Sequence, residues 1–451
     1  MSVSAKLIWR IVKPKIYQSY VQQKKIRQLP IEEIKKKQWD RLVALLTYVE
    51  KNSTFYHEQF KKINFDINNF KSYDDLRKIP IIDKKTLKIN YDNIITKDSS
   101  NQDYVVSYTS GSTGEPFPFL IDKKREPHKT FAAFMLNKQH VGINPFKKQN
   151  ELMIKIHPVN EIKDLQKNFK QGIFHNIKYH FASETFGLKS LDINEKNIDS
   201  ICSIIKKHKI SGIYGYSSNI FSLAKLLKNR NKKLNLKYVI LIAEGILNQQ
   251  KQLISEIFNC PVYMDYGSSE CMRMGFDCKK CDGYHMDLYN YYFEYLDDKG
   301  KPCKPGENAN IVVTNLNNYI FPLIRYKIGD QCIVSNKNCS CNLNYPIVSS
   351  IIGRSSDIIK TSSDIEVPLL NLRSVLQDYY DFIFQYQIVV YQKKNMILIK
   401  IIPTKQVSLD LKEQIKKRIS ELLHHSMNVE IEIVKNIEFD KNGKTKTIIM
   451  K

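Results

Sequence analysis

Residues 107–116 are the first place where residue types and spacing point to chemistry. They read Ser-Tyr-Thr-Ser-Gly-Ser-Thr-Gly-Glu-Pro and lead into the apolar run 117–121. Small hydroxyl residues and glycines let a backbone curl so that successive N–H groups point into one concavity, which suits an anion. The segment lacks the Gly-Lys-Ser/Thr ending of the common P-loop. Taken alone, it is either a phosphate-binding loop or a flexible turn.

Four later segments carry further polar residues in a fixed order. They span Tyr266–Glu270 (Tyr-Gly-Ser-Ser-Glu), Arg325–Asp330, Gly353–Lys360 and Asn442–Lys446. With the loop, they resemble the acyl-adenylate-forming superfamily of acyl-CoA synthetases, luciferases and peptide-synthetase adenylation domains. Within it, the sequence is most similar to the phenylacetate–CoA ligase branch and its capsular-polysaccharide-biosynthesis (CapK-like) relatives. Segments 214–218 and 243–245 also match that branch, so the resemblance covers nearly the whole chain.

The resemblance implies how the chain would bind ATP. A mobile loop that starts at Thr109 would hold the phosphates, Tyr266 would stack on the adenine, and Asp330 would accept hydrogen bonds from the ribose. Arg354 would approach the same nucleotide. The full implied set is Ser110, Gly111, Ser112, Thr113, Gly114, Ala243, Glu244, Gly245, Tyr266, Gly267, Ser268, Ser269, Asp330 and Arg354.

The resemblance also implies catalytic and acid-binding residues. Glu270 would bind Mg²⁺, which prefers oxygen ligands. Thr109, the first residue of the phosphate loop, is also implied to be catalytic. Lys444 would reach the carboxylate and the α-phosphate and offset negative charge in the transition state, with Lys446 as the alternative. The acid pocket would include Tyr214, Gly215, Tyr216 and Ser217. The structural alternatives are a helix cap for Glu270, a Gly-Asp turn for Asp330 and a surface position for Lys444.

The cysteines suggest a second site. Cys278 and Cys281 are followed by His285, and a Cys-Ser-Cys segment spans Cys339–Cys341. Thiolate and imidazole ligands in closely spaced pairs suit a tetrahedral, structural Zn²⁺, and some members of the resembled branch have a similar spacing. We expect Cys278, Cys339 and Cys341 as ligands, with Cys281 or His285 as the fourth; the alternative is a set of reduced, free cysteines.

Patterns of apolar residues indicate the elements that must position these groups. Residues 34–51 have helical spacing, and Asp83 is placed to cap a helix that starts at Lys84. From about residue 104, short apolar runs (152–156, 212–214, 238–242, 262–264) alternate with helical segments (198–208, 220–228), which is typical of an α/β domain. Strands are expected at 290–296, 310–316, 385–391, 396–402 and 429–434, with a helix capped by Ser408 and a turn at 440–443.

We therefore predict an α/β protein of two domains. A large, multi-sheet adenylation domain would span residues 1–356, and a small, mobile α+β lid would span 357–451. The resembled family commonly has an acidic residue where this chain has Ser356, so the hinge is expected at Ser356 or Asp357.

Composition narrows the class of protein. The 451 residues carry a formal net charge of +24 and nine cysteines. Such a charge is explained either by an anionic partner or by a lysine-rich surface that is simply solvated. No nucleic-acid-binding module is recognisable in the sequence. No apolar stretch approaches the length of a membrane span. Residues 1–20 suit either a surface helix or weak contact with a membrane surface. The odd number of cysteines does not indicate a disulfide framework, which favours the cytoplasm.

The predicted function is ATP-dependent activation of a carboxylic acid through an acyl-adenylate. The acceptor would be coenzyme A, as in the resembled ligases, or an amine or hydroxyl of a saccharide, in surface polysaccharide biosynthesis. A non-catalytic basic binding protein of the same fold is the rival hypothesis. The oligomeric state stays open, with a homodimer as one alternative. No metalloprotease, nucleophile-elbow or Rossmann motif is present.

Overall fold

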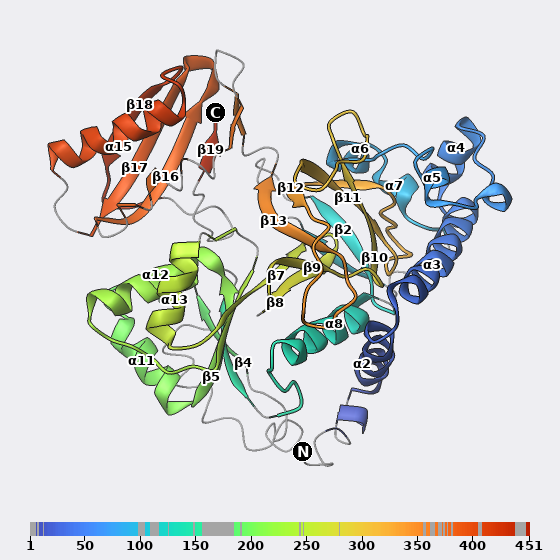
Figure 1. Cartoon of the computed structure of the whole chain (residues 1–451), viewed down its shortest axis with the longest axis horizontal. Coiled ribbons are helices and arrows are strands. Elements are labelled where there is room, and N and C mark those ends of the chain that lie inside the picture. The colour runs from blue at the N-terminus through green and yellow to red at the C-terminus, as the bar shows by residue number, and fades with distance from the viewer. Residues whose placement is uncertain are drawn as a thin grey trace. The chain divides into compact units, whose positions relative to one another are not determined.

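The computed structural model describes most of the chain, which folds into two compact units. Unit 1 comprises Met1–Lys148 and Tyr263–Ile352, and unit 2 comprises Gln149–Val262 and Gly353–Lys451. Figure 1 shows the elements of both. The described residues are 6, 9–11, 13–97, 104–108, 117–124, 126–147, 149–155, 185–189, 192–242, 245–246, 248–278, 280–354, 358–360, 366–368, 372, 375–376, 378–379, 382–404, 408–437 and 448–451.

Unit 1 begins with a series of helices. The predicted helix over 34–51 is confirmed as α3, whose Ile34, Leu42 and Val49 are fully buried. Asp83 caps α6 as predicted, since its carboxylate accepts a hydrogen bond from Thr86 N at 2.8 Å. The helices are α2 (Pro14–Arg27), α3 (Ile31–Asn52), α4 (Thr54–Lys62), η1 (Ile67–Asn69), α5 (Tyr73–Leu76), α6 (Lys84–Ile89), α7 (Tyr91–Ile94) and α8 (Glu126–His140).

The strands of unit 1 form a hairpin and part of a large sheet. The hairpin pairs β1 (Tyr104–Tyr108) with β2 (Pro118–Asp122), and it flanks the predicted phosphate loop. The sheet strands follow the order β10-β11-β12-β13-β9-β8-β7. Their bounds are β7 (Val262–Ser268), β8 (Met272–Cys278), β9 (Cys281–Met286), β10 (Tyr291–Leu296), β11 (Asn308–Asn315), β12 (Tyr326–Val334) and β13 (Ile347–Arg354).

Unit 2 contains the parallel sheet that the alternating pattern predicted. Its strands follow the order β6-β5-β3-β4, and each strand runs parallel to its neighbours. Figure 1 shows three helices of this unit beside these strands. The elements are β3 (Asn150–Lys155), β4 (Thr185–Lys189), α11 (Ile198–Lys207), β5 (Ile210–Tyr216), α12 (Ser217–Asn229), β6 (Tyr238–Ile242) and α13 (Asn248–Phe258).

The C-terminal part of unit 2 has a core of its own, as predicted. Helix α15 packs its buried Ile415 and Ile419 with apolar residues of a four-stranded sheet of order β18-β17-β16-β19 (Figure 1). Ser408 caps α15 by accepting a hydrogen bond from Leu411 N at 3.1 Å. The elements are β14 (Ile358–Lys360), β15 (Glu366–Pro368), β16 (Ile383–Tyr391), η5 (Gln392–Lys394), β17 (Met396–Pro403), α15 (Leu409–Leu422), β18 (Asn428–Ile433) and β19 (Ile448–Met450).

The architecture confirms the predicted fold class, a large multi-sheet α/β body with a C-terminal α/β domain. The proposed domain boundary at 356/357 stays a prediction, and the turn predicted at 440–443 lies outside the described residues. None of the helices in the described part of the chain combines the length and apolar character that a membrane span requires.

Candidate functional site

Tyr266 and Asp330 lie on different strands of unit 1 and are brought into direct contact. The Tyr266 hydroxyl on β7 donates a hydrogen bond to Asp330 Oδ2 on β12 over 2.9 Å. Burial, and then the neighbouring Asp330 charge, raise the pKa of Tyr266, so its hydroxyl stays protonated and able to donate. The contact holds the Asp330 carboxylate in place on β12.

Glu270 lies two residues after the end of β7 and is also buried in unit 1. Glu270 is only 7 % exposed. The hydroxyl of Tyr326, at the start of β12, donates a hydrogen bond to Glu270 Oε1 over 3.3 Å. Among the described residues, no lysine or arginine forms an ion pair with Glu270. A buried carboxylate with a single hydroxyl donor suits a cation or a ligand's donor groups.

The turn between β7 and β8 is shaped by two residues of the Tyr266–Glu270 segment. A Cβ atom on Gly267 would lie 1.9 Å from the carbonyl oxygen of Met272, so only glycine fits there. Ser268 Oγ accepts a hydrogen bond from Cys271 N over 3.0 Å and closes the turn. This turn carries Ser269 and fixes Glu270 four residues after Tyr266.

Arg325 anchors the start of β12, which carries both Tyr326 and Asp330. Its Nε and Nη2 atoms each donate to the Glu294 carboxylate over 2.9 Å, and both residues are almost fully buried. Nη1 donates to the carbonyl oxygen of Arg77 over 2.8 Å and also to that of Ile79. The sequence marked Arg325 only as part of a motif; the structure shows it to be a positioning residue of the scaffold.

The predicted acid-binding segment lies in unit 2 at the junction of β5 and α12. Tyr214, Gly215 and Tyr216 end the strand and Ser217 begins the helix, with Ser217 buried. A Cβ atom on Gly215 would lie 2.6 Å from the carbonyl oxygen of Ile154 on the paired strand β3, so that this position also requires glycine. Gly245, from the predicted adenine pocket, is exposed.

Several predicted site residues lie outside what the structure describes. The described ranges leave out the catalytic Lys444 and the alternative Lys446, and of Arg354 they include the backbone but not the side chain. Their roles therefore stay predictions. The other predicted residues in this group are Thr109, Ser110, Gly111, Ser112, Thr113, Gly114, Ala243 and Glu244.

We expect Tyr266→Phe to lower the free energy of unfolding by about 1.5–3 kcal/mol, the usual contribution of a hydrogen bond to a charged group. Tyr295→Phe is the matched control, since the Tyr295 hydroxyl is buried and has no hydrogen-bond partner among the described residues. Its removal should be neutral or slightly stabilising. Chemical denaturation of both variants measures the difference, and equal effects would contradict the stabilising role of the Tyr266–Asp330 contact.

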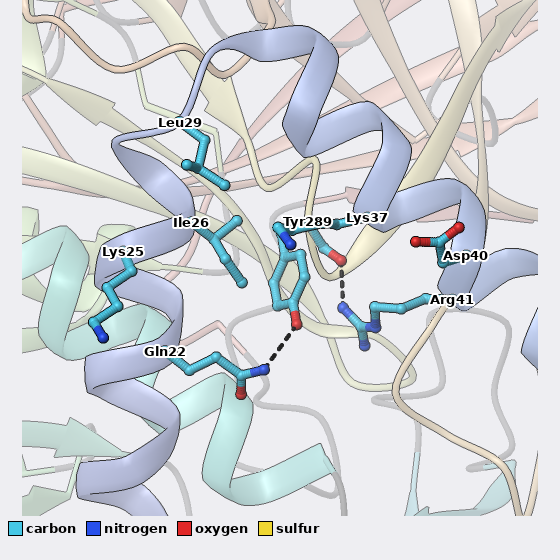
Figure 2. Close-up of a pocket in the computed structure, with 8 residues that line it drawn as sticks. All are labelled: Gln22, Lys25, Ile26, Leu29, Lys37, Asp40, Arg41 and Tyr289. Atoms are coloured by element: carbon cyan, nitrogen blue, oxygen red, sulfur yellow. Dashed lines mark hydrogen bonds between the residues drawn. The ribbon is translucent and has the colours of Figure 1, made fainter.

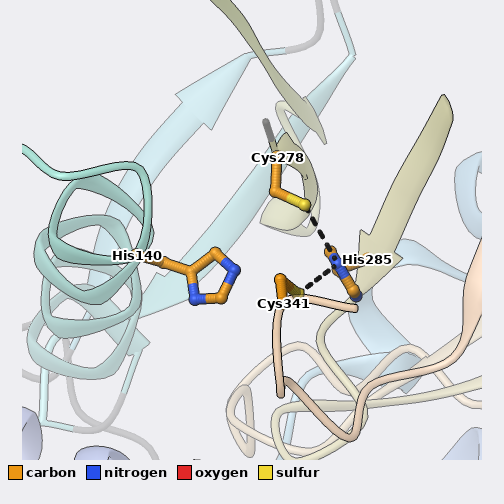
Figure 3. Close-up of side chains that lie close together, drawn as sticks. All are labelled: His140, Cys278, His285 and Cys341. Atoms are coloured by element: carbon orange, nitrogen blue, oxygen red, sulfur yellow. Dashed lines mark hydrogen bonds between the residues drawn. The ribbon is translucent and has the colours of Figure 1, made fainter. Parts of the chain in front are cut away.

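The predicted metal ligands gather in unit 1 (Figure 3). Cys278 Sγ lies 3.5 Å from both His285 Nε2 and Cys339 Sγ, and Cys341 Sγ lies 3.3 Å from His285 Nε2. The hairpin of β8 and β9 brings Cys278 close to His285. The structure thus places His285 beside Cys278 and Cys341, whereas the side chain of Cys281 lies outside its described part, and the choice between the two as fourth ligand stays a prediction.

One residue of this cluster carries no signal in the sequence. His140, the last residue of α8, places a ring nitrogen near the others, and the ligand atoms of His140, Cys278, His285 and Cys341 all lie within 4.8 Å of one another. A lone histidine more than a hundred residues from the cysteines has no local spacing pattern. Only the packing of α8 near β8 reveals it.

A pocket of about 410 Å³ lies elsewhere in unit 1, between α2 and α3 (Figure 2). Arg41, at its edge, already donates to the backbone oxygens of Tyr289 and Leu316 and to Asn317. The remaining cationic residues, Lys25 and Lys37, are exposed. None of the predicted site residues lines this pocket.

Comparisons with known proteins show which proteins the chain resembles. Residues 359–451 match the family model of the CapK C-terminal domain. The chain is 23 % identical to Protein CapK of Staphylococcus aureus, over 91 % of this chain and 87 % of that protein. It is 24 % identical to the phenylacetate-coenzyme A ligase of Thermus thermophilus, over 82 % and 80 % of the two chains.

Solved structures share the fold at low sequence identity. A 2-hydroxyisobutyryl-CoA ligase in the postadenylation state matches with a TM-score of 0.73 and 17 % identity, covering 94 % of this chain and 91 % of that one. The O-succinylbenzoate coenzyme A synthetase of Bacillus subtilis, in complex with ATP and magnesium, matches with a TM-score of 0.52 and 17 % identity, covering 76 % and 68 %.

The chain therefore shares its fold with acyl-CoA ligases that form acyl-adenylates. In sequence it is similar to protein CapK and to phenylacetate-coenzyme A ligases, and residues 359–451 match the model of the CapK C-terminal domain.

Proposed function

We propose that the protein is an ATP-dependent, AMP-forming ligase that activates a carboxylic acid through an acyl-adenylate. The observation that carries the proposal is the arrangement in unit 1 of two acidic residues, each held by a tyrosine: Asp330 by Tyr266 and Glu270 by Tyr326. Both acids come from segments that follow the family's order, on a fold shared with CoA ligases. Relatives that carry ligase names span most of the chain, which supports the same chemistry here.

The proposed reaction has two steps. An oxygen of the substrate carboxylate attacks the α-phosphorus of ATP, and the bond to the β-phosphate oxygen breaks to release pyrophosphate. A nucleophile then attacks the acyl carbon, and AMP leaves with the former carboxylate oxygen. In this scheme Asp330 accepts hydrogen bonds from the ribose, the loop from Thr109 to Gly114 holds the phosphates, and Lys444 offsets charge at the reacting centre.

Mg²⁺ fits the Glu270 carboxylate. The carboxylate is buried and takes one hydroxyl donor from Tyr326, and Mg²⁺ is commonly held by one or two carboxylates together with substrate phosphates. When bound, the ion would neutralise phosphate charge. The contribution of the chain itself is to fix Glu270 through the glycine turn that precedes it.

Glu270→Gln should therefore raise the Mg²⁺ concentration needed for half-maximal pyrophosphate release by about tenfold or more. The reason is that the amide keeps the shape of the side chain but loses the negative charge. Glu58→Gln, at an exposed position of α4, is the control and should not change the requirement. An unchanged Mg²⁺ requirement in Glu270→Gln would remove Glu270 from the proposed site.

Coenzyme A is the acceptor that the relatives support best, since they include phenylacetate- and 2-hydroxyisobutyryl-CoA ligases. The similarity to protein CapK keeps a saccharide or an amine as the alternative. The net charge of +24 suits an anionic acceptor in either case. Unchanged turnover after neutralisation of the cluster Lys206–Lys209 would count against a role for that part of the surface.

A structural Zn²⁺ is the second part of the proposal. Three donor pairs, Cys278 with His285, Cys278 with Cys339 and Cys341 with His285, are separated by 3.3–3.5 Å. These separations fit edges of a tetrahedron around one ion, for which metal–ligand lengths predict about 3.4–3.8 Å. Four protein ligands leave no open position, so the ion would stabilise unit 1 rather than take part in the reaction.

The test of the ligase function is pyrophosphate release by purified protein with Mg-ATP and a panel of aryl acids, short hydroxy acids and amino acids. Each acid is tested without and with coenzyme A. Release that depends on one class of acid would support the proposal, and multiple turnovers only with coenzyme A would identify the acceptor. ATP binding without release for any acid would favour the non-catalytic alternative. The lid motion about Ser356 or Asp357 and the cytoplasmic location remain predictions that this assay does not address.

A further inference from the structure

The metal cluster contains more donors than one zinc ion can use. Five side chains of unit 1 meet there: His140, Cys278, His285, Cys339 and Cys341. Tetrahedral zinc takes four ligands. One of the five must therefore stay outside the coordination sphere at any moment.

Three of the five residues, Cys278, His285 and Cys341, are ligands in both sets of four that we consider. Cys278 Sγ and Cys341 Sγ lie 3.5 Å and 3.3 Å from His285 Nε2, which is the separation expected for ligands of the same ion. His285 is fully buried and Cys278 nearly so. These three residues come from the β8–β9 hairpin and from the loop after β12, two segments that are far apart in sequence.

Cys339 and His140 compete for the fourth position. Cys339 Sγ lies 3.5 Å from Cys278 Sγ, close to the edge of a tetrahedron. His140 lies on α8, and its ring nitrogen is within 4.8 Å of the ligand atoms of the three common residues. Its ring packs edge-on against Phe276 and His285, with centroid separations of 5.6 Å and 6.0 Å, and faces the cluster (Figure 3).

The surroundings disfavour water as a substitute ligand. The cluster is packed with the buried apolar residues Phe276, Leu343 and Tyr345. Zn²⁺ has no geometric preference from its d electrons, so one side chain can replace another at small cost. A half-buried imidazole beside the vacated position is a better replacement for a lost thiolate than water that must enter an apolar environment.

We propose that His140 is a reserve ligand of this metal centre. Zinc is held by Cys278, His285, Cys341 and Cys339, and His140 takes the fourth position when Cys339 is lost to oxidation, alkylation or substitution. In the exchange, a neutral ring nitrogen of His140 binds the ion in place of a thiolate, and the net charge of the centre rises by one. The inference rests on the proposed zinc site and is independent of the ligase reaction.

The test uses the full chain purified with zinc, without ATP or acid. Zinc affinity is measured by competition with a chelator, and X-ray absorption at the zinc edge counts sulfur and imidazole ligands. The wild type should show three sulfurs and one imidazole. Cys339→Ala should show two sulfurs and two imidazoles, with affinity reduced by about tenfold, and the double variant Cys339→Ala/His140→Ala should lose about a further hundredfold.

Two controls separate ligand exchange from damage to the fold. Cys303→Ala removes a cysteine of similar exposure outside the cluster and should keep wild-type affinity. His140→Ala alone should also bind zinc as the wild type does, because Cys339 is still present. The proposal is overturned if Cys339→Ala has one imidazole, or if the double variant binds zinc as tightly as Cys339→Ala. A wild type without zinc would overturn the zinc site itself, whereas missing pyrophosphate release would affect only the ligase proposal.

Discussion

Lys444→Ala should lower acid-dependent pyrophosphate release by about 10²–10³-fold, the effect of removing one group that stabilises charge in a transition state. In the proposed reaction, negative charge builds up where the carboxylate meets the α-phosphate, and Lys444 supplies the matching positive charge. ATP affinity should change little, because the nucleotide contacts assigned to Tyr266 and Asp330 remain. Single-turnover measurements with saturating ATP separate the loss of rate from a loss of binding.

Lys446→Ala is the matched control for this prediction. It removes the same charge two residues further along the same segment, and its rate should stay within about twofold of the wild type, as expected for a lysine without a role in the reaction. A large loss in Lys446→Ala with a small one in Lys444→Ala would transfer the catalytic role to Lys446. Equal and small losses in both variants would contradict a catalytic lysine in this segment.

Arg325→Met should lower the free energy of unfolding of unit 1 by about 3–5 kcal/mol, because it leaves a buried carboxylate without its partner. The guanidinium makes two hydrogen bonds of 2.9 Å with Glu294, and both side chains are 4 % exposed. It also bonds the carbonyl oxygens of Arg77 and Ile79, which would lose their donor. Since β12 begins at the next residue, the same variant should also weaken ATP binding through Asp330.

Urea unfolding followed by tryptophan fluorescence suits this measurement. The chain has two tryptophans, Trp9 and Trp39, and both lie in unit 1 with Arg325. The control is Lys327→Met, because the ion pair of Lys327 with Asp298 is longer, at 3.7 Å, and Asp298 is largely exposed. That pair should contribute at most about 1 kcal/mol. Similar losses in the two variants would contradict the assigned role of the buried pair.

The sequence predicted most of the elements because their signals are local. Apolar spacing identified α3, and Asp83 and Ser408 marked the starts of α6 and α15 through side chains that cap the next few residues. Short apolar runs predicted the parallel strands β5 and β6, since a strand covered on both faces is apolar along its length. The site segments were found through their order along the chain.

Contacts between distant residues were not predictable in the same way. Nothing local shows that Tyr266 would meet Asp330, that Tyr326 would meet Glu270, or that Arg325 would pair with Glu294, because each contact depends on the order of strands in the sheet. His140 is the clearest example, since only the position of α8 brings it to the cysteines. Sequence order predicted which residues act, and tertiary packing shows which neighbours hold those that the structure describes.

The most direct test of the central claim follows oxygen atoms from the acid to AMP. The acid that gives the fastest pyrophosphate release is labelled with ¹⁸O in its carboxylate, allowed to turn over with ATP and coenzyme A, and the nucleotide products are analysed by mass spectrometry. An acyl-adenylate intermediate predicts AMP that carries one ¹⁸O atom, since the carboxylate oxygen that attacks the α-phosphorus stays with it when the acyl group leaves. Unlabelled AMP, or ADP as the product, would contradict the proposed function.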